Sequence, residues 1–139
     1  LNRHAPQLEC IAGDVLHPPA ELLHRQFHII TCNPPYLTAA DMEQLQPEVA
    51  REPETALFGG TDGLDFYRSI TSKWKDALRP GGVLAAVLYS GKVIGDAEKQ
   101  AALAFFRSLP LADYTVLICE FANWADTAPL PCFVIKREK

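Results

Sequence analysis

An apolar, β-branched run that ends abruptly at two prolines constrains this fold more than any other feature of the sequence. The run is Phe27–Cys32, and Asn33-Pro34-Pro35 follows it directly. Such a run indicates a strand buried in a sheet, and proline has no backbone N–H with which to extend strand pairing. We therefore expect the strand to end at Asn33 and the chain to turn out of the sheet there.

Alternating strands and helices are predicted along the rest of the 139 residues, a length that fits one domain. The composition of short runs predicts strands at residues 8–12, 27–32, 83–89, 114–121 and 132–136. Periodicity predicts helices at residues 39–46, 65–78 and 96–108, and residues 47–63 are expected to form a long structured loop. This alternation indicates an α/β layer fold with right-handed crossovers. The last two strands have no helix between them, so we expect an antiparallel pair at one edge.

Local signals define the ends of these elements. Thr38 and Asp96 are suited to cap the helices that follow them. The Arg79-Pro80-Gly81-Gly82 turn is expected to end the helix at residues 65–78, and a loop with Pro129 and Pro131 is expected before the last strand. One face of the 65–78 helix is expected to carry its apolar side chains, which are Phe66, Ile70, Trp74 and Leu78.

Composition and charge limit the class of protein. The net charge is −4 and the sequence pI is about 5.5, which disfavours a nucleic-acid ligand without excluding one, because nucleic-acid binders are usually basic. No apolar run approaches the roughly 20 residues needed to span a bilayer. We expect a cytoplasmic protein without a membrane span or a metal site, in which the cysteines are buried, reduced thiols. These cysteines are Cys10, Cys32, Cys119 and Cys132.

The tetrapeptide Asn33-Pro34-Pro35-Tyr36 is the motif with the clearest chemistry. It follows a buried strand, and ligands of α/β sheets bind beyond the carboxyl ends of the strands. An amide or exocyclic amine nitrogen is a poor nucleophile, so hydrogen-bond acceptors must hold its N–H groups. The Asn33 side-chain oxygen and the Pro34 carbonyl can accept, the prolines fix the backbone, and Tyr36 offers a flat face to a planar group. A simple turn is the alternative interpretation.

In its context this tetrapeptide resembles the HemK-type family, the release factor glutamine N5-methyltransferases. The similarity covers roughly residues 1–86 and includes Glu48-Val49, Glu52-Pro53, the segment Ala56-Leu57-Phe58-Gly59-Gly60-Thr61-Asp62-Gly63-Leu64-Asp65-Phe66-Tyr67-Arg68, and Leu78-Arg79-Pro80-Gly81-Gly82. The resemblance implies an S-adenosylmethionine-dependent methyltransferase whose partner and substrate is a peptide chain release factor. It implies that Asn33, Pro34, Pro35 and Tyr36 hold the glutamine amide. It also implies that Asp14, Val15 and Asn33 contact the cofactor.

The chain departs from that family at two places. His28 stands where the family usually has aspartate, which puts little in doubt because the change lies inside a strand. From about residue 87 the chain looks more like a small rRNA methylase family, which the segments Tyr89-Ser90-Gly91, Gly95-Asp96-Ala97-Glu98 and Phe121-Ala122-Asn123 and Pro129 resemble. Both families share the Rossmann-like class I methyltransferase fold.

The sequence contains no G-x-G-x-G loop, which in this fold holds the methionine part of the cofactor. The resemblance therefore implies that residues 1–139 are the C-terminal portion of a methyltransferase domain. The sheet would hold only strands three to seven of the order 3-2-1-4-5-7-6. We expect such a chain alone to bind S-adenosylmethionine very weakly and to be inactive. The strand at residues 8–12 would lack its neighbours, so we expect marginal stability, dimerisation, or direct pairing of residues 8–12 with residues 27–32.

Three functional interpretations stay open at this point. The leading one is an N-methyltransferase that acts on a glutamine of a release factor. An rRNA or DNA amino-methyltransferase is favoured by the resemblance of the tail and opposed by the net charge of −4. The third is a non-catalytic fragment that only binds a partner. The oligomeric state does not follow from the sequence.

Overall fold

The computed structural model describes residues 8–89, 96–125 and 128–138, and a four-stranded sheet lies at its centre. The strands are β1 (Phe27–Cys32), β2 (Leu78–Leu88), β3 (Tyr114–Ile118) and β4 (Leu130–Lys136), in the order β1-β2-β4-β3. β1 and β2 are parallel, whereas β4 runs antiparallel to both β2 and β3. This order confirms the predicted arrangement of strands four to seven, with the antiparallel pair at one edge.

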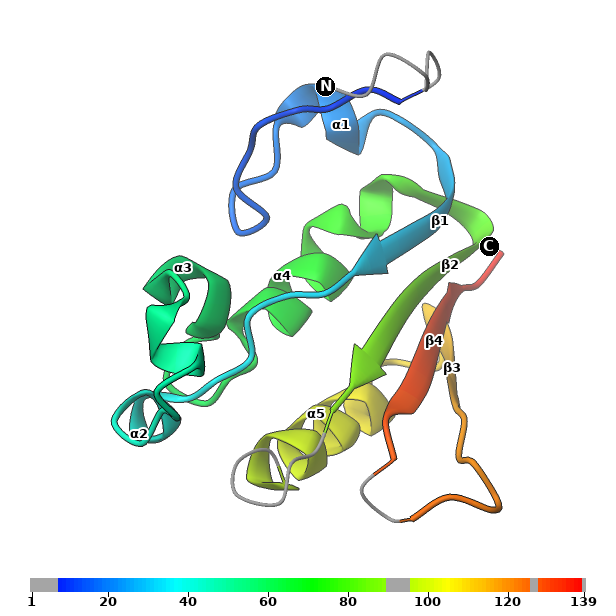
Figure 1. Ribbon diagram of the computed structural model, residues 1–139. Coiled ribbons are helices and arrows are strands. Elements are labelled where there is room, and N and C mark those ends of the chain that lie inside the picture. The colour runs from blue at the N-terminus through cyan, green and yellow to red at the C-terminus, as the bar shows by residue number, and fades with distance from the viewer. Residues whose placement is uncertain (1–7, 90–95, 126–127, 139) are drawn as a thin grey trace.

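Two longer helices and several short ones accompany the sheet. The longer ones are α4 (Asp65–Ser72) and α5 (Asp96–Ser108), which lie on the same side of the sheet (Figure 1). The short ones are α1 (Ala20–Leu23), α2 (Ala39–Met42) and α3 (Glu54–Leu57), with the 3-10 turns η1 (Val49–Arg51) and η2 (Trp74–Asp76). Within the described part of the chain, no helix has the length and apolarity needed to cross a bilayer.

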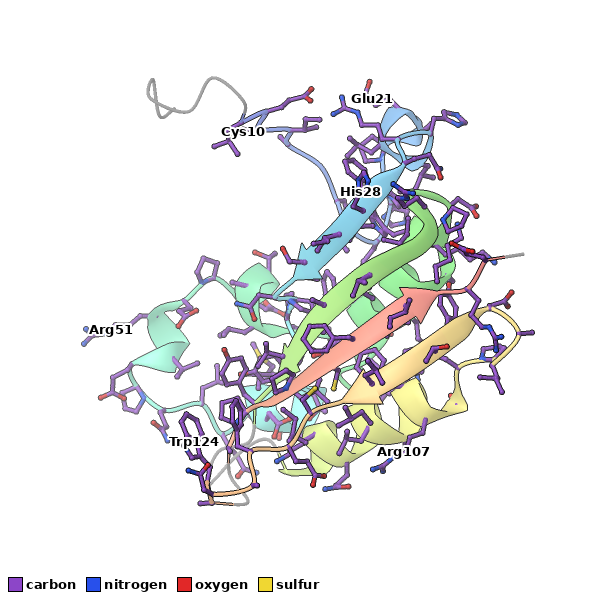
Figure 2. All side chains as sticks on the ribbon, turned by 90° about the vertical axis from the view of Figure 1, so that its right-hand side faces the viewer. Cys10, Glu21, His28, Arg51, Arg107 and Trp124 are labelled. Atoms are coloured by element: carbon purple, nitrogen blue, oxygen red, sulfur yellow. The ribbon has the colours of Figure 1, made fainter. Side chains whose placement is uncertain are left out.

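The hydrophobic core lies between the sheet and the helices α4 and α5. Phe106 of α5 and Cys132 of β4 are completely buried in it. The other face of the sheet points toward the viewer in Figure 2 and has no helix over it. Since side chains alternate between the two faces of a strand, Ile29 of β1, Val87 of β2 and Leu117 of β3 lie on this face and are exposed.

Residues 8–13 form no strand, which corrects the strand predicted at residues 8–12. A strand is stable only when its backbone groups are paired, and among the described residues nothing pairs with the outer edge of β1. Direct pairing of residues 8–12 with β1 therefore does not occur. The segment is instead tied to the turn after α1 by two hydrogen bonds of 2.5 and 3.1 Å from the Arg25 guanidinium to the Glu9 carboxylate.

The helix predicted at residues 65–78 is shorter than expected. α4 ends at Ser72, and η2 follows it as a tighter turn. The Thr71 hydroxyl donates to the Tyr67 carbonyl at 2.9 Å, and the Ser72 hydroxyl donates to the Arg68 carbonyl at 2.6 Å. Hydroxyls that bond to the preceding turn weaken a helix interior, so the sequence itself favours an early end.

The buried face of α4 also differs from the predicted one. Tyr67 and Ile70 are buried, whereas Phe66 and Trp74 are only half-buried. Leu78 is buried, but it lies outside the helix as the first residue of β2. Of the four predicted residues, Ile70 alone is a buried residue of α4, whose buried face also includes Tyr67 and Thr71.

The Arg79-Pro80-Gly81-Gly82 sequence forms an irregularity inside β2 and does not end a helix. Between Phe27 and Ile29 of β1, the paired position on β2 advances from Leu78 to Val83. The extra β2 residues bulge outward, and Gly81 adopts a φ of 73° there. That left-handed conformation favours glycine.

The region between β1 and α4 holds more regular structure than predicted. Thr38 caps α2 as expected: its hydroxyl accepts from the Asp41 N–H at 3.2 Å, and the Asp41 carboxylate accepts from the Thr38 N–H at 3.0 Å. α2 ends at Met42, earlier than the predicted residue 46. Residues 47–63 contain η1 and α3, so they are not a loop throughout.

The boundaries of the last elements are partly confirmed. α5 spans the predicted residues 96–108, although the side chain of its expected cap, Asp96, lies outside the described residues. β3 ends at Ile118, before the predicted residue 121. β4 begins at Leu130, so Pro131 lies in the strand opposite Val87 and not in the loop.

A buried hydrogen bond links β3 to α4. The Tyr114 hydroxyl donates to the Thr71 carbonyl at 2.7 Å. We expect Tyr114→Phe to lower the free energy of unfolding by about 1–3 kcal/mol, because the substitution leaves a buried carbonyl without this donor. Urea unfolding followed by circular dichroism measures the change. The control is Tyr89→Phe at a half-exposed tyrosine, with an expected change within about 0.5 kcal/mol. Equal effects of the two substitutions would contradict this role of Tyr114.

The cysteines differ in burial, which corrects the expectation of four buried thiols. All four are free, but Cys10 and Cys119 are exposed. Burial raises the pKa of the Cys32 and Cys132 thiols to about 11, so both stay protonated at neutral pH.

We expect iodoacetamide at pH 8 to modify Cys10 and Cys119 at least tenfold faster than Cys32 and Cys132, because the thiolate is the reactive form. Peptide mass spectrometry measures the rates, and equally fast modification of Cys132 would refute the burial described for it.

Candidate functional site

The Asn33-Pro34-Pro35-Tyr36 segment leaves the carboxyl end of β1, at the edge of the sheet where β2 also ends (Figure 1). Pro34 is buried and Pro35 and Tyr36 are half-buried, whereas Asn33 is exposed. The Asn33 side chain makes no hydrogen bond with any residue that the structure describes. The motif is therefore anchored by the buried Pro34, and the exposed side-chain amide of Asn33 can accept or donate hydrogen bonds.

A second segment, far along the chain, holds this motif in place. The Leu37 N–H donates to the Leu57 carbonyl at 3.0 Å, and the Gly59 N–H donates to the Leu37 carbonyl at 2.9 Å. Between these bonds, Leu37 pairs in parallel with Phe58. A side chain at position 59 would place its Cβ only 2.7 Å from the Tyr36 Cα. Glycine is therefore required at position 59 for the two backbones to lie this close.

The loop from Gly59 to Asp65 is shaped by its own backbone and by one ion pair. Gly60 has a φ of 100°, and the Asp65 N–H donates to the Gly59 carbonyl at 3.0 Å, which leads the chain into α4. The Arg68 guanidinium donates two hydrogen bonds to the Asp62 carboxylate, at 2.9 and 2.6 Å. These bonds hold the pKa of Asp62 below its usual range. Asp62 is therefore ionised and structural, and it ties the loop to α4.

A small pocket lies beneath the motif. Tyr36, Tyr67 and Leu88 line it, together with Tyr89 and Lys99. Burial raises the pKa of the Tyr67 hydroxyl, so this group stays protonated at neutral pH. The nearby Cys32 thiol is also protonated at neutral pH, so the Tyr67 hydroxyl and the Cys32 thiol are both neutral groups near Tyr36.

Two of the three predicted cofactor contacts, Asp14 and Val15, lie in a different part of the structure from Asn33. The Asp14 carboxylate accepts from the Leu16 N–H and bonds to the His17 Nδ1, both at 2.8 Å, and chiefly the His17 bond lowers the pKa of Asp14. The Val15 carbonyl accepts from the Ser69 hydroxyl and the Trp74 Nε1, both at 2.9 Å.

Residues 14–15 thus lie beside the C-terminal half of α4 and η2, whereas Gly59 and the acceptor motif lie beside the start of α4. The structure brings Asn33, Pro34, Pro35 and Tyr36 together, and it places Asp14 and Val15 apart from them. The cofactor role of Asp14 and Val15 stays a prediction. Across the described residues, no group of histidines, cysteines and carboxylates is arranged to hold a metal ion.

Two features of this site are not apparent from the sequence. Gly59 is only part of a family signature there, and its contact with Tyr36 depends on the fold. Lys99 of α5 is 8% exposed and lines the pocket below Tyr36. Its spacing of four and seven residues from Leu103 and Phe106, both buried, was the available signal. Lysine is almost never buried without a partner, so its default assignment is to the surface.

Comparison with known sequences relates the chain to two groups of methyltransferases. The family described as "Putative rRNA methylase" matches residues 67–135. The release factor glutamine methyltransferase of Geobacter sulfurreducens is 43% identical over 92 residues, which cover 66% of this chain and 31% of that protein. The protein of the same name from Moorella thermoacetica is 38% identical over 100 residues, which cover 72% of this chain and 34% of that protein. The chain thus spans about a third of the length of these relatives.

Comparison with solved structures shows the same fold. A putative rRNA methylase from Clostridium thermocellum aligns with a TM-score of 0.53 at 19% identity, over 83% of this chain and 50% of that one. An rRNA methylase from Streptococcus thermophilus aligns with a TM-score of 0.51 at 24% identity, over 82% of this chain and 53% of that one. At these identities the alignments show the fold alone. The chain is thus similar in sequence to release factor glutamine methyltransferases over part of their length, and it has part of the Rossmann-like class I methyltransferase fold.

Proposed function

We propose that this protein takes part in S-adenosylmethionine-dependent methylation of a glutamine side-chain nitrogen in a peptide chain release factor. One observation carries the proposal: the exposed amide of Asn33, free of hydrogen bonds to described residues, follows β1 directly on a backbone fixed by two prolines and by Gly59. The names of the relatives from Geobacter and Moorella support the choice of glutamine and of a release factor.

The proposed role of the motif is to hold the acceptor amide. The Asn33 side-chain oxygen and the Pro34 carbonyl would accept hydrogen bonds from the two N–H groups of the substrate amide, and Tyr36 would pack against its plane. Acceptors aimed at a nitrogen that becomes positively charged stabilise the transition state more than the ground state. The packing of Leu37 and Gly59 keeps these groups in place before the substrate arrives.

The residues that would meet the cofactor are Asp14, Val15 and Asn33. The Asp14 carboxylate already accepts two hydrogen bonds, but its side chain is 56% exposed and a carboxylate has about four acceptor sites. It therefore fits a donor such as the amino group of an adenine. When bound, S-adenosylmethionine supplies the methyl group. We propose that residues 1–139 contribute the acceptor side of the site and only part of the cofactor site, because the sequence has no G-x-G-x-G loop.

A second candidate function is methylation of an amino group on a nucleic-acid base. The match of residues 67–135 to the "Putative rRNA methylase" family favours it. The same motif could hold an exocyclic amine, since that nitrogen is also conjugated and carries two N–H groups. The net charge of −4 opposes it, because phosphate contacts by lysine and arginine supply most of the affinity for nucleic acids.

The role of Asn33 can be tested in an active enzyme. The matched segment of the Geobacter sulfurreducens relative is replaced by the corresponding residues of this chain, and Asn33→Ala is introduced. We expect the rate of glutamine methylation to fall by roughly a hundredfold or more, the scale seen when one preorganised polar contact is removed. Transfer of labelled methyl groups to purified release factor, with the site located by mass spectrometry, measures the rate.

A matched substitution, Gln44→Ala at an exposed side-chain amide between α2 and η1, is the control and should leave the rate within about twofold. A near-normal rate in the Asn33→Ala enzyme would show that the motif is only a turn. Methyl transfer to purified rRNA and not to the release factor would favour the second candidate.

A further inference from the structure

A groove runs between α5 and the loop that joins β3 to β4. It has a volume of about 310 Å³. One side is a single face of α5 that carries Lys99, Leu103 and Arg107, which are four residues apart from one to the next. The other side is the loop, which contributes Phe121 and Trp124. The groove is therefore a trough along a helix, open toward the solvent at the loop.

Lys99 connects this groove to the candidate acceptor site. Its side chain lines the groove and also lines the small pocket that lies beneath Tyr36 and Tyr89. The two hollows thus share a wall formed by one buried residue. The groove therefore adjoins the pocket of the candidate acceptor site at Lys99.

Two aromatic rings stand exposed at the loop side of the groove. The rings of Phe121 and Trp124 are stacked with their centroids 4.6 Å apart and their planes 26° apart. Phe121 is 45% exposed and Trp124 is 60% exposed. Aromatic side chains that stay this exposed and are already ordered by each other offer a preformed apolar surface, and such surfaces mark interaction sites.

The opposite end of the groove carries a positive charge. Arg107 lies in the last turn of α5 and is exposed, and none of the described carboxylates forms a salt bridge with it. Figure 2 shows Trp124 and Arg107 well apart along the lower part of the molecule. From Lys99 to Arg107 the helix rises about 12 Å, at 1.5 Å per residue. An extended peptide of about four residues spans that length.

We propose that the groove binds an extended segment of the acceptor protein that flanks the methylated glutamine. This inference rests on the proposed function, in which the acceptor is a protein. An apolar side chain near the glutamine would pack on Phe121 and Trp124. An acidic side chain about four residues from the glutamine would pair with Arg107. Phe121, Trp124 and Arg107 would then determine which glutamine is selected.

The observations favour a peptide over a nucleic acid as the occupant. The groove has the length of several extended residues and one solvent-exposed cation at its far end, which matches a single carboxylate. A nucleic-acid strand would bring a phosphate at every nucleotide to a chain whose net charge is −4. Glu120 also lines the groove and would repel a phosphate backbone.

The test measures binding of fluorescent peptides to the 139-residue chain, without cofactor, by anisotropy. The probes are blocked hexapeptides with glutamine first, leucine third and aspartate, asparagine or lysine fifth. We expect the aspartate peptide to bind roughly fivefold tighter than the lysine peptide, the scale of an exposed ion pair. Arg107→Glu should reverse that order, and Trp124→Ala should weaken all three peptides by about tenfold. Arg51→Glu, at an exposed arginine of η1 (Figure 2), is the matched control and should leave the order unchanged.

An unchanged order of the peptides in the Arg107→Glu protein would overturn the inference, provided that circular dichroism shows both variants folded. Binding of a single-stranded RNA decamer tighter than any peptide, with loss in Trp124→Ala, would assign the groove to nucleic acid and would also overturn it. Because the assay contains no methyl transfer, its failure is separate from a failure of the role proposed for Asn33.

Discussion

The close approach of Gly59 to the backbone of Pro35 and Tyr36 is the contact on which the arrangement of the site depends. A hydrogen atom in place of a side chain lets two segments more than twenty residues apart run side by side, joined by the bonds of Leu37 to Leu57 and Gly59. Proline residues cannot hold the motif by strand pairing, since they have no N–H to donate. The segment around Gly59 supplies backbone hydrogen bonds to Leu37 that the sheet does not supply. The same segment then leads into α4 through the hydrogen bond from the Asp65 N–H to the Gly59 carbonyl.

The rest of the fold places the motif and Gly59 at one edge of the sheet. β1 and β2 are parallel, so both end on the side where the motif emerges. α5 covers the same face of the sheet as α4 (Figure 1). Lys99 on α5 thereby comes to lie next to Tyr36 and Tyr89, and the loop between β3 and β4 adds Phe121 and Trp124 nearby. Residues from four separate stretches of sequence therefore lie near this edge of the sheet. Only the first stretch, Asn33–Tyr36, has a motif whose chemistry can be recognised in the sequence.

The sequence predicts correctly those strands, helices and caps whose local signals favour the same structure as their tertiary contacts. The apolar run at Phe27–Cys32, the helix over residues 96–108 and the Thr38 cap formed as predicted, because strand composition, helical period and capping chemistry act over a few residues. Two of the failed predictions depended on distant partners. Residues 8–12 have strand composition but nothing to pair with among the described residues, and Pro131 lies in β4 opposite Val87, where its carbonyl accepts from the Cys119 N–H. The contact of Gly59 with Tyr36 and the burial of Lys99 likewise arise from tertiary packing, which no local pattern encodes.

The measurement that tests the central contact most directly is hydrogen exchange at the Leu37 amide in a Gly59→Ala protein. A Cβ at position 59 would lie 2.7 Å from the Tyr36 Cα and 2.8 Å from the Pro35 carbonyl oxygen, so the two segments must separate. Gly13→Ala is the control, because a Cβ there meets only the Pro19 ring, at 3.4 Å or more. We expect the Leu37 amide to exchange at least tenfold faster in Gly59→Ala than in the unsubstituted protein, and at an unchanged rate in Gly13→Ala. Equal protection of the Leu37 amide in both variants would show that the contact at Gly59 does not hold the two segments together.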